Sequence, residues 1–136
     1  MTQTNGSNLD NYYTLVQKNG KLRSPDHAQR WSTAVLKTLG FNLEKGAKKE
    51  LAGALPKELA NDLTRVFWLL HFRDTNLSRS DFLTQASRRS GNTDVAFARY
   101  PTKAVFGAVK SLINKQVADR VAEGLSPEVR ELWQQA

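Results

Sequence analysis

The sequence repeats itself: residues 10–66 can be laid over residues 80–136 at a constant offset of 70, with no gap. Apolar residues coincide at the positions that a helical core needs. The matched pairs include Tyr12 with Phe82, Ala28 with Ala98, Leu39 with Val109, and Leu59 with Val129. Because core positions and helix stops keep one register while few polar residues match, we interpret the pattern as a duplicated helical unit. The duplication constrains the architecture and leaves the chemistry open.

Helix signals dominate the chain, and no alternating run of β-branched residues predicts a strand. Spacing and caps predict eight helices, over about 8–18, 24–39, 43–54, 56–70, 79–89, 94–110, 115–123 and 126–133. We expect Ser7 to cap the first helix and Gly40 to end the second. Asn42 is expected to cap the third helix, and Pro101 to kink or divide the sixth near Tyr100.

These elements predict an all-α protein in which two tandem, pseudo-symmetric four-helix modules pack into one compact helical bundle. We expect a flexible N-terminus over residues 1–7, a first module over 8–70, a connector over 71–77 and a second module over 78–136. Residues 66–70 make the fourth predicted helix apolar on every side. Such a helix must be covered all round, so we expect it to lie between the two modules.

Composition excludes several classes of function. The chain has no cysteine, which rules out disulfides, thiolate nucleophiles and cysteine metal sites. No run of about 18 apolar residues offers a membrane span. Residues 1–7 are polar and uncharged beyond the terminus, so they lack the basic start and apolar stretch of a secretory signal. We therefore expect a cytoplasmic protein.

Catalytic and metal-binding patterns are missing. The two histidines, His27 and His71, are too far apart in the sequence to form a metal pair on one helix. Capping and the helix dipole explain the carboxylates in first turns, which are Asp10, Asp26, Asp81, Asp94, Glu58 and Glu128. We predict no catalytic residue, no metal site, no cofactor and no enzymatic activity. A buried cleft of convergent carboxylates would favour an enzyme instead.

The repeated segments also carry a family resemblance. They are 28–39 with 51–59 in the first copy, and 98–109 with 121–133 in the second. These segments resemble the bacterial domain of unknown function 2267, over nearly the whole chain after residue 8. The second copy departs from the pattern because it reads Leu-Ser-Pro over 125–127 and has Pro101 inside its long helix. The resemblance implies an all-helical bacterial protein and supplies no catalytic residues.

Basic residues give the main functional signal, because the net charge is +7. Lys45, Lys48 and Lys49 share one side of the third predicted helix, and Lys103 and Lys110 lie along a flank of the sixth. A solvated helix face would explain these lysines without a ligand. A surface that contacts phosphates is the sharper alternative.

Our leading hypothesis is a non-enzymatic protein-interaction or scaffold module, because helical repeats make surfaces and no reactive group is evident. Its partner would be another protein or a second copy of the chain. Trp68 and Trp133 are the candidate interface residues, provided that they are exposed. The alternative is electrostatic, sequence-tolerant nucleic-acid binding through the five lysines named above.

Overall fold

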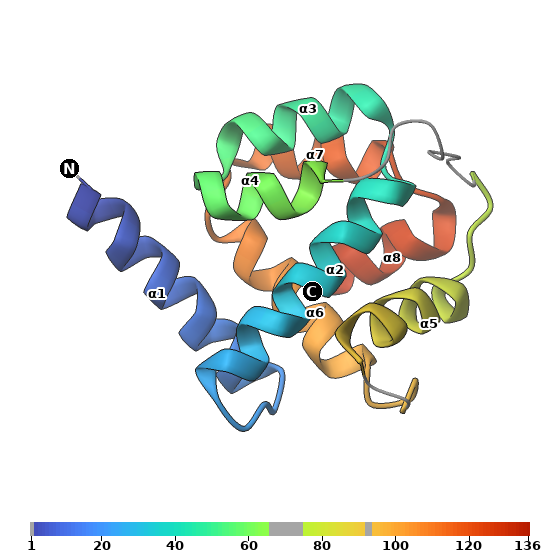
Figure 1. Cartoon of the computed structure of the whole chain (residues 1–136). Helices are drawn as coiled ribbons and strands as arrows, with labels where there is room; N and C mark the ends of the chain where they lie inside the picture. Colours follow the sequence, from blue (N-terminus) through green and yellow to red (C-terminus); the bar gives the residue numbers. More distant parts are fainter. Residues whose placement is uncertain (1, 66–74, 92–93) are drawn as a thin grey trace.

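The computed structural model describes residues 2–65, 75–91 and 94–136, and for residues 2–7 it describes the backbone only. All regular structure in these ranges is helical, which confirms the predicted all-α class (Figure 1). The helices are α1 (Thr2–Asn19), α2 (Pro25–Asn42), α3 (Lys45–Ala54), α4 (Lys57–Thr64), α5 (Arg79–Ser90), α6 (Arg99–Lys110), α7 (Lys115–Glu123) and α8 (Pro127–Gln135).

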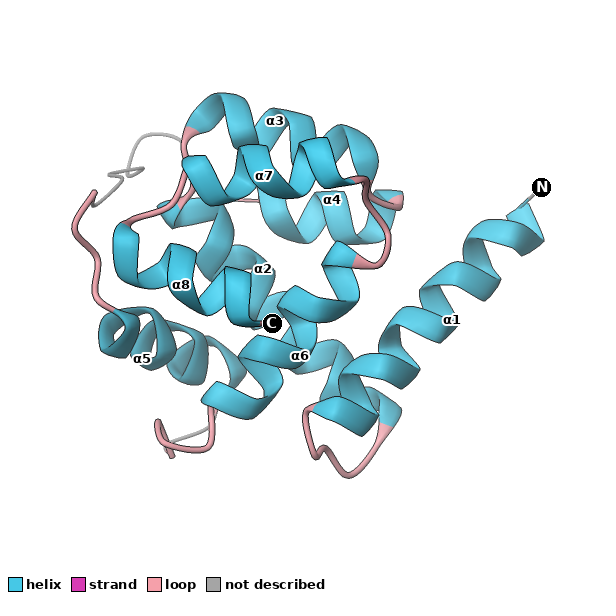
Figure 2. Cartoon of the chain, turned by 180° about the vertical axis from the view of Figure 1, so that it is seen from behind, coloured by secondary structure: helices cyan, strands magenta, loops and turns pink. Residues whose placement is uncertain are grey.

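Helix α2 lies at the centre and packs against α1, α4, α5 and α6. Helix α3 lies between α4 and α7, while α8 packs against α5, α6 and α7. The N-terminal turns of α1 extend away from the other helices in both views (Figures 1 and 2). Contacts therefore cross between the halves of the sequence: α1 packs on α6, and α5 packs on α2.

The later helix starts in the two halves keep the sequence offset, whereas α1 and α5 start 77 residues apart and α2 and α6 start 74 residues apart. Helices α3 and α7 begin at Lys45 and Lys115, and α4 and α8 begin at Lys57 and Pro127, in each case 70 residues apart. That the two halves superpose as pseudo-symmetric modules stays a prediction.

The core is built on the apolar stripe predicted for the second helix. Ala28, Trp31, Val35 and Leu39 are at most 1% exposed, so α2 is covered along its length. Burial of such stripes is the main favourable contribution to folding. Because α2 is enclosed by neighbours, only part of its circumference can carry polar side chains, and that part lines the groove described below.

Local signals placed several helix ends correctly. Ser24 caps α2 by accepting a hydrogen bond from the His27 amide at 3.2 Å, as a serine before proline favours. Ser78 caps α5, and Gly91 ends it with a left-handed φ of 81°. Helix α7 has the predicted bounds, with Asn114 as its cap.

The N-terminal segment differs from the prediction. Helix α1 begins at Thr2 rather than near Asn8, so Ser7 lies inside the helix instead of capping it. Flexibility of residues 1–7 stays a prediction. Once the later turns of α1 are anchored on α2 and α6, each added residue gains one hydrogen bond at little further cost. Extension of an existing helix is therefore easier than starting one at Asn8.

Gly40 does not end α2, which continues to Asn42, so this prediction was wrong. The reason is tertiary. Helix α4 crosses α2 at this point, and a Cβ atom on Gly40 would collide with the carbonyl oxygen of Leu63. Glycine here permits a close approach of two backbones rather than a change of chain direction.

The cap of α3 is also different from the prediction. Asn42 belongs to the end of α2, where its Nδ2 donates to the Thr38 carbonyl at 2.8 Å. Glu44 caps α3 instead, because its carboxylate accepts hydrogen bonds from the amides of Gly46 and Ala47, both at 2.9 Å. A carboxylate at this position also suits the positive end of the helix dipole.

The sixth helix is shorter than predicted, with Pro101 near its start. Residues 95–98 form turns, and α6 begins at Arg99, which places Pro101 in the first helical turn. A proline is tolerated there because the first amides of a helix have no helical partner. The predicted start at Asp94 was therefore wrong, and so was the predicted kink or division near Tyr100, because α6 begins next to that residue.

Two predictions lie outside the described residues. They are the apolar segment 66–70, with the interface candidate Trp68, and most of the connector 71–77, with His71. Within the part of the chain that is described, no helix has the length and apolar character to cross a bilayer.

Candidate functional site

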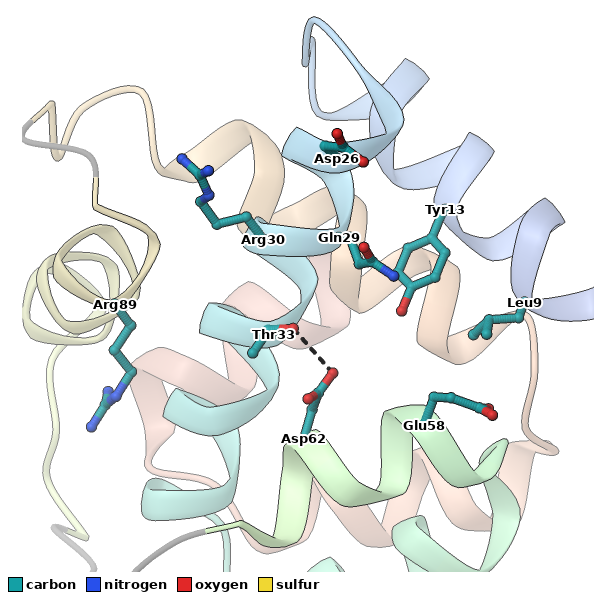
Figure 3. Close-up of a pocket in the computed structure, with 9 residues that line it drawn as sticks. All are labelled: Leu9, Tyr13, Asp26, Gln29, Arg30, Thr33, Glu58, Asp62 and Arg89. Atoms are coloured by element: carbon teal, nitrogen blue, oxygen red, sulfur yellow. Dashed lines mark hydrogen bonds between the residues drawn. The ribbon is translucent and has the colours of Figure 1, made fainter. Parts of the chain in front are cut away.

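A hollow of about 500 Å³ opens between α1, α2 and α4 (Figure 3). Its lining residues are Leu9, Tyr13, Asp26, Gln29, Arg30, Thr33, Glu58, Asp62 and Arg89. Leu9 and Tyr13 come from α1, and Glu58 and Asp62 stand one turn apart on α4. Most of the polar side chains therefore come from helices that meet only in the folded protein.

Asp62 lies at the bottom of this hollow. Thr33 Oγ1 donates a hydrogen bond to Asp62 Oδ2 at 3.2 Å, and the carboxylate is half-buried (Figure 3). Burial raises the pKa of Asp62, while the Thr33 bond and the nearby charges of Lys37 and Arg65 act in the opposite direction. Among the described residues, Thr33 is the one hydrogen-bond partner of this carboxylate.

Tyr13 faces the same space from α1 (Figure 3). Its phenol is half-buried, and burial raises its pKa; the negative charges of Asp62 and Glu58 raise it further, against a hydrogen bond with Gln29. The hydroxyl therefore stays protonated at neutral pH. It can donate a hydrogen bond to a ligand that enters the hollow.

A second hollow, of about 450 Å³, continues along α1 and shares four lining residues with the first: Leu9, Tyr13, Asp26 and Gln29. Asp10 lines its far part. We call the two joined hollows the acidic groove. It runs along the side of α1 that faces α2 and α4, and four carboxylates are distributed along it, from Asp10, Asp26, Glu58 and Asp62.

Two guanidinium groups stand at the opposite edge, from Arg30 and Arg89. Both point away from the space between Tyr13 and Asp62 (Figure 3). Arg89 is already engaged, since its Nη1 donates to Thr38 Oγ1 at 2.8 Å and its Cζ lies 4.7 Å from the centre of the Phe41 ring. The lining of the groove therefore carries more carboxylates than guanidinium groups, on a protein whose net charge is +7. Such a lining can bind a cationic group by charge-assisted hydrogen bonds.

Sequence reasoning missed this groove. It explained Asp26 and Glu58 by the helix dipole, which their positions in the first turns of α2 and α4 do support. Asp62 follows Glu58 by four residues and so shares its helix face. That spacing was the available signal, but nothing local indicates that α1 brings Tyr13 opposite it.

The predicted lysines are not equivalent in the structure. Lys45, Lys49 and Lys103 are exposed. Lys48 donates from Nζ to the Gly40 carbonyl at 2.9 Å, and Lys110 donates to the Trp133 carbonyl at 2.8 Å. Burial lowers the pKa of the Lys48 and Lys110 ammonium groups.

The five lysines also occupy two separate helices. The first three lie on α3, which packs against α4 and α7, and the last two lie on α6, which packs against α1, α2 and α8. Two of the five ammonium groups are already bonded to helix carbonyls. The set is therefore a poor description of one phosphate-binding surface.

Trp133 cannot serve as an exposed interface residue. It is 2% exposed, its ring centre lies 5.2 Å from that of Phe106, and its Nε1 donates to the Ala118 carbonyl at 3.1 Å. The condition of exposure is not met at Trp133, because α8 packs against three other helices.

Comparison with known families tests the family resemblance that the repeated segments carry. The model of an uncharacterized conserved protein family, DUF2267, matches residues 10–132. The chain belongs to the DUF2267 family. Comparison with curated proteins gave no match. For this DUF2267 chain, function must therefore be inferred from the geometry of its own surface.

Proposed function

We propose that this protein is a non-enzymatic interaction module that binds a basic segment of a partner protein in the acidic groove. The observation that carries the proposal is Asp62. Its carboxylate is half-buried in the lining of an open hollow, and Thr33 is its hydrogen-bond partner among the described residues. Burial disfavours the charged form of the carboxylate and raises the pKa of Asp62. A lysine or arginine of a partner would offset this cost by a charge-assisted hydrogen bond.

The shape of the groove supports a polypeptide as the ligand. The two hollows follow α1 one after the other, with apolar contacts from Leu9 and Tyr13 beside the carboxylates. An amphipathic helix or extended segment binds such a groove by placing apolar residues inside it and charged residues along its edge. Binding is favoured over catalysis because the site is open, whereas enzyme sites usually enclose their substrates. The bacterial and cytoplasmic setting expected from the sequence remains part of this proposal.

The test uses a labelled amphipathic peptide with leucine and lysine at helical spacing, titrated into the full chain by fluorescence anisotropy. The double variant E58Q/D62N should bind it about tenfold more weakly, which corresponds to about 1.4 kcal/mol. The matched control is D119N/E123Q, which removes an Asp/Glu pair with the same spacing from the exposed side of α7. Equal binding by the two double variants contradicts the proposal. So does a glutamate version of the peptide that binds as well as the lysine version.

A further inference from the structure

The loop between α1 and α2 lies against the first turn of α6. A Cβ atom on Gly20 would stand 3.2 Å from the Cα of Pro101 and 2.6 Å from the Val16 carbonyl, so these backbones are in close contact. Lys21 follows with a left-handed φ of 58°, which is unusual for a residue with a side chain. This turn directs Lys21 toward α6 rather than back along α1.

Tyr100 holds two cations at this junction. The Nζ atom of Lys21 lies 4.4 Å from the centre of the Tyr100 ring, and the Cζ atom of Arg99 lies 4.8 Å from it. Arg99 Nη2 also donates to the Tyr100 hydroxyl at 2.7 Å. The hydrogen bond from Arg99 lowers the pKa of Tyr100, and the charges of Arg99 and Lys21 lower it further. Cation–π contacts thus hold two positive side chains at one aromatic ring.

Two further cations border this pair. Arg23 and Lys21 line a hollow of about 340 Å³ beside α6, together with His27 and Asp94. Lys103 is exposed on α6, one turn beyond Arg99 and on the same helix face. We call Lys21, Arg23, Arg99, Tyr100 and Lys103 the Tyr100 patch.

Asp94 is the carboxylate that lines this hollow. Its Oδ1 accepts a hydrogen bond from the Phe97 amide at 3.2 Å, so part of its bonding capacity is used in the turn before α6. Against this single negative charge, the patch holds four positive ones. The local excess of positive charge is therefore large enough to attract a polyanion.

We propose that the Tyr100 patch binds the phosphate backbone of a nucleic acid without reading its sequence. The contacts available are guanidinium and ammonium donors, which bind phosphate oxygens and carry no base specificity. Lys21 and Arg99 already lie over the Tyr100 ring, so base stacking is a weaker use of this surface than phosphate contact. The cations are spread over a loop and one helical turn, which suits a row of phosphates better than one small anion. This site is separate from the acidic groove and does not depend on it.

The experiment measures the anisotropy of a labelled DNA duplex of mixed sequence, titrated with the full chain between about 50 and about 200 mM salt. Binding should weaken steeply with salt, with a slope of about −3 to −4 in log K against log salt if four phosphates are contacted. The test variant is K21Q/R23Q/R99Q. The control is K45Q/K49Q/K57Q, which removes three exposed charges from α3 and α4 and includes two lysines of the sequence-based site.

The patch variant should lose at least about tenfold in affinity, and its salt slope should become shallower by about 2 to 3. The control variant has the same net charge as the patch variant, but its affinity should stay within about twofold of the wild type. Equal losses in both variants would mean that total charge, and not the patch, governs binding. A wild-type chain that does not bind the duplex at low salt overturns the proposal directly.

Three further measurements check folding, the role of the ring and the kind of ligand. Thermal unfolding followed by circular dichroism checks that both triple variants fold, and Y100L provides a second variant in which all cations remain. Without the ring, Lys21 and Arg99 lose their common support, so Y100L should bind the duplex several-fold more weakly.

The last measurement compares binding of the wild type and of the patch variant to vesicles with and without an anionic lipid. If the patch variant loses vesicle binding while duplex binding is unchanged, the ligand is a lipid surface and the proposal is wrong.

Discussion

The two halves of the chain treat the same core position differently. In the first half, the Tyr12 hydroxyl and Ser32 Oγ share a buried hydrogen bond of 2.7 Å. At an offset of 70 the second half has Phe82 and Thr102. Thr102 Oγ1 is buried and has no hydrogen-bond partner among the described residues. Phenylalanine cannot supply the hydroxyl that tyrosine supplies, so a polar pair in one half corresponds to a lone hydroxyl in the other.

The two halves also differ where their second helix crosses their fourth, which is α2 with α4 in the first half and α6 with α8 in the second. Gly40 allows the backbone of α2 to touch α4 at Leu63. The matched residues of the second half are Lys110 and Trp133, and there the Lys110 ammonium reaches the Trp133 carbonyl at 2.8 Å. A direct backbone contact in one half is thus replaced by a long side chain in the other. A repeated sequence can keep its core positions while each copy satisfies its polar groups in its own way.

The largest expected effect is at the glycine that has no counterpart in the second half. G40A should destabilise the protein by about 2–3 kcal/mol, because the added methyl group overlaps a backbone carbonyl that cannot move cheaply. G53A is the matched control, since nothing lies within 4 Å of a Cβ at that position. G53A should stabilise the protein by about 0.5–1 kcal/mol, because alanine loses less backbone entropy than glycine when the chain folds. Urea unfolding measures both, and a neutral G40A would show that the close contact of α2 and α4 is not needed.

The next largest loss of stability is expected at the buried pair of the first half, Tyr12 and Ser32. Y12F removes one hydroxyl and leaves Ser32 Oγ buried without its partner, so it should cost about 1–2 kcal/mol. The double variant Y12F/S32A should cost less than the sum of the two single variants, because no unpaired hydroxyl remains. Additive losses in urea unfolding would show that the two side chains do not act as a pair.

The lone hydroxyl of the second half gives a prediction of opposite sign. T102V should stabilise the protein by about 1 kcal/mol, since a methyl group replaces a buried hydroxyl without a partner. The comparison becomes sharper with F82Y. If the halves superpose, the new hydroxyl will meet Thr102 and stabilise the protein, whereas in the T102V background F82Y will destabilise it. A loss of the same size in both backgrounds would show that the halves are not equivalent at this point.

The smallest effect concerns two matched helix caps, Glu44 of α3 and Asn114 of α7. The amides of Gly46 and Ala47 lower the pKa of Glu44 from its ordinary value of 4.5 to about 2, with a further contribution from Arg120. A carboxyl group whose folded pKa is lowered stabilises the protein above its unfolded pKa. That stability is lost as the pH falls through the folded pKa.

E44Q should therefore be less stable than the wild type at pH 7, and the difference should shrink between about pH 5 and about pH 2. N114A is the control, because an amide does not titrate; its loss of about 1 kcal/mol should not change over this range. Thermal unfolding across the pH series measures both variants. A pH-independent E44Q difference would rule out the charged cap.

Local features made much of the fold predictable. The bounds of α7 and the cap Ser24 follow from signals that act within one helical turn, whereas such signals left Ser78 and Ser80 open as the cap of α5. The buried stripe of α2 follows from spacing alone, because a helix returns the same face every three to four residues. The role of Gly40 was not predictable in this way, since it depends on which helix crosses α2. The start of α1 was not predictable either, since it depends on the anchoring of the later turns of α1 on α2 and α6.

The candidate sites were less predictable than the fold. Asp62, Thr33 and Tyr13 come from three helices, and Lys21 meets Tyr100 across about eighty residues of chain. The sequence by itself determined the helical class, the principal helix ends, the core stripe and membership of the DUF2267 family. Only the tertiary structure decided which charged groups are bonded internally and which remain available to a ligand. The physical reason is range: capping and periodicity act over a few residues, whereas the pairing of polar groups depends on which helices cross.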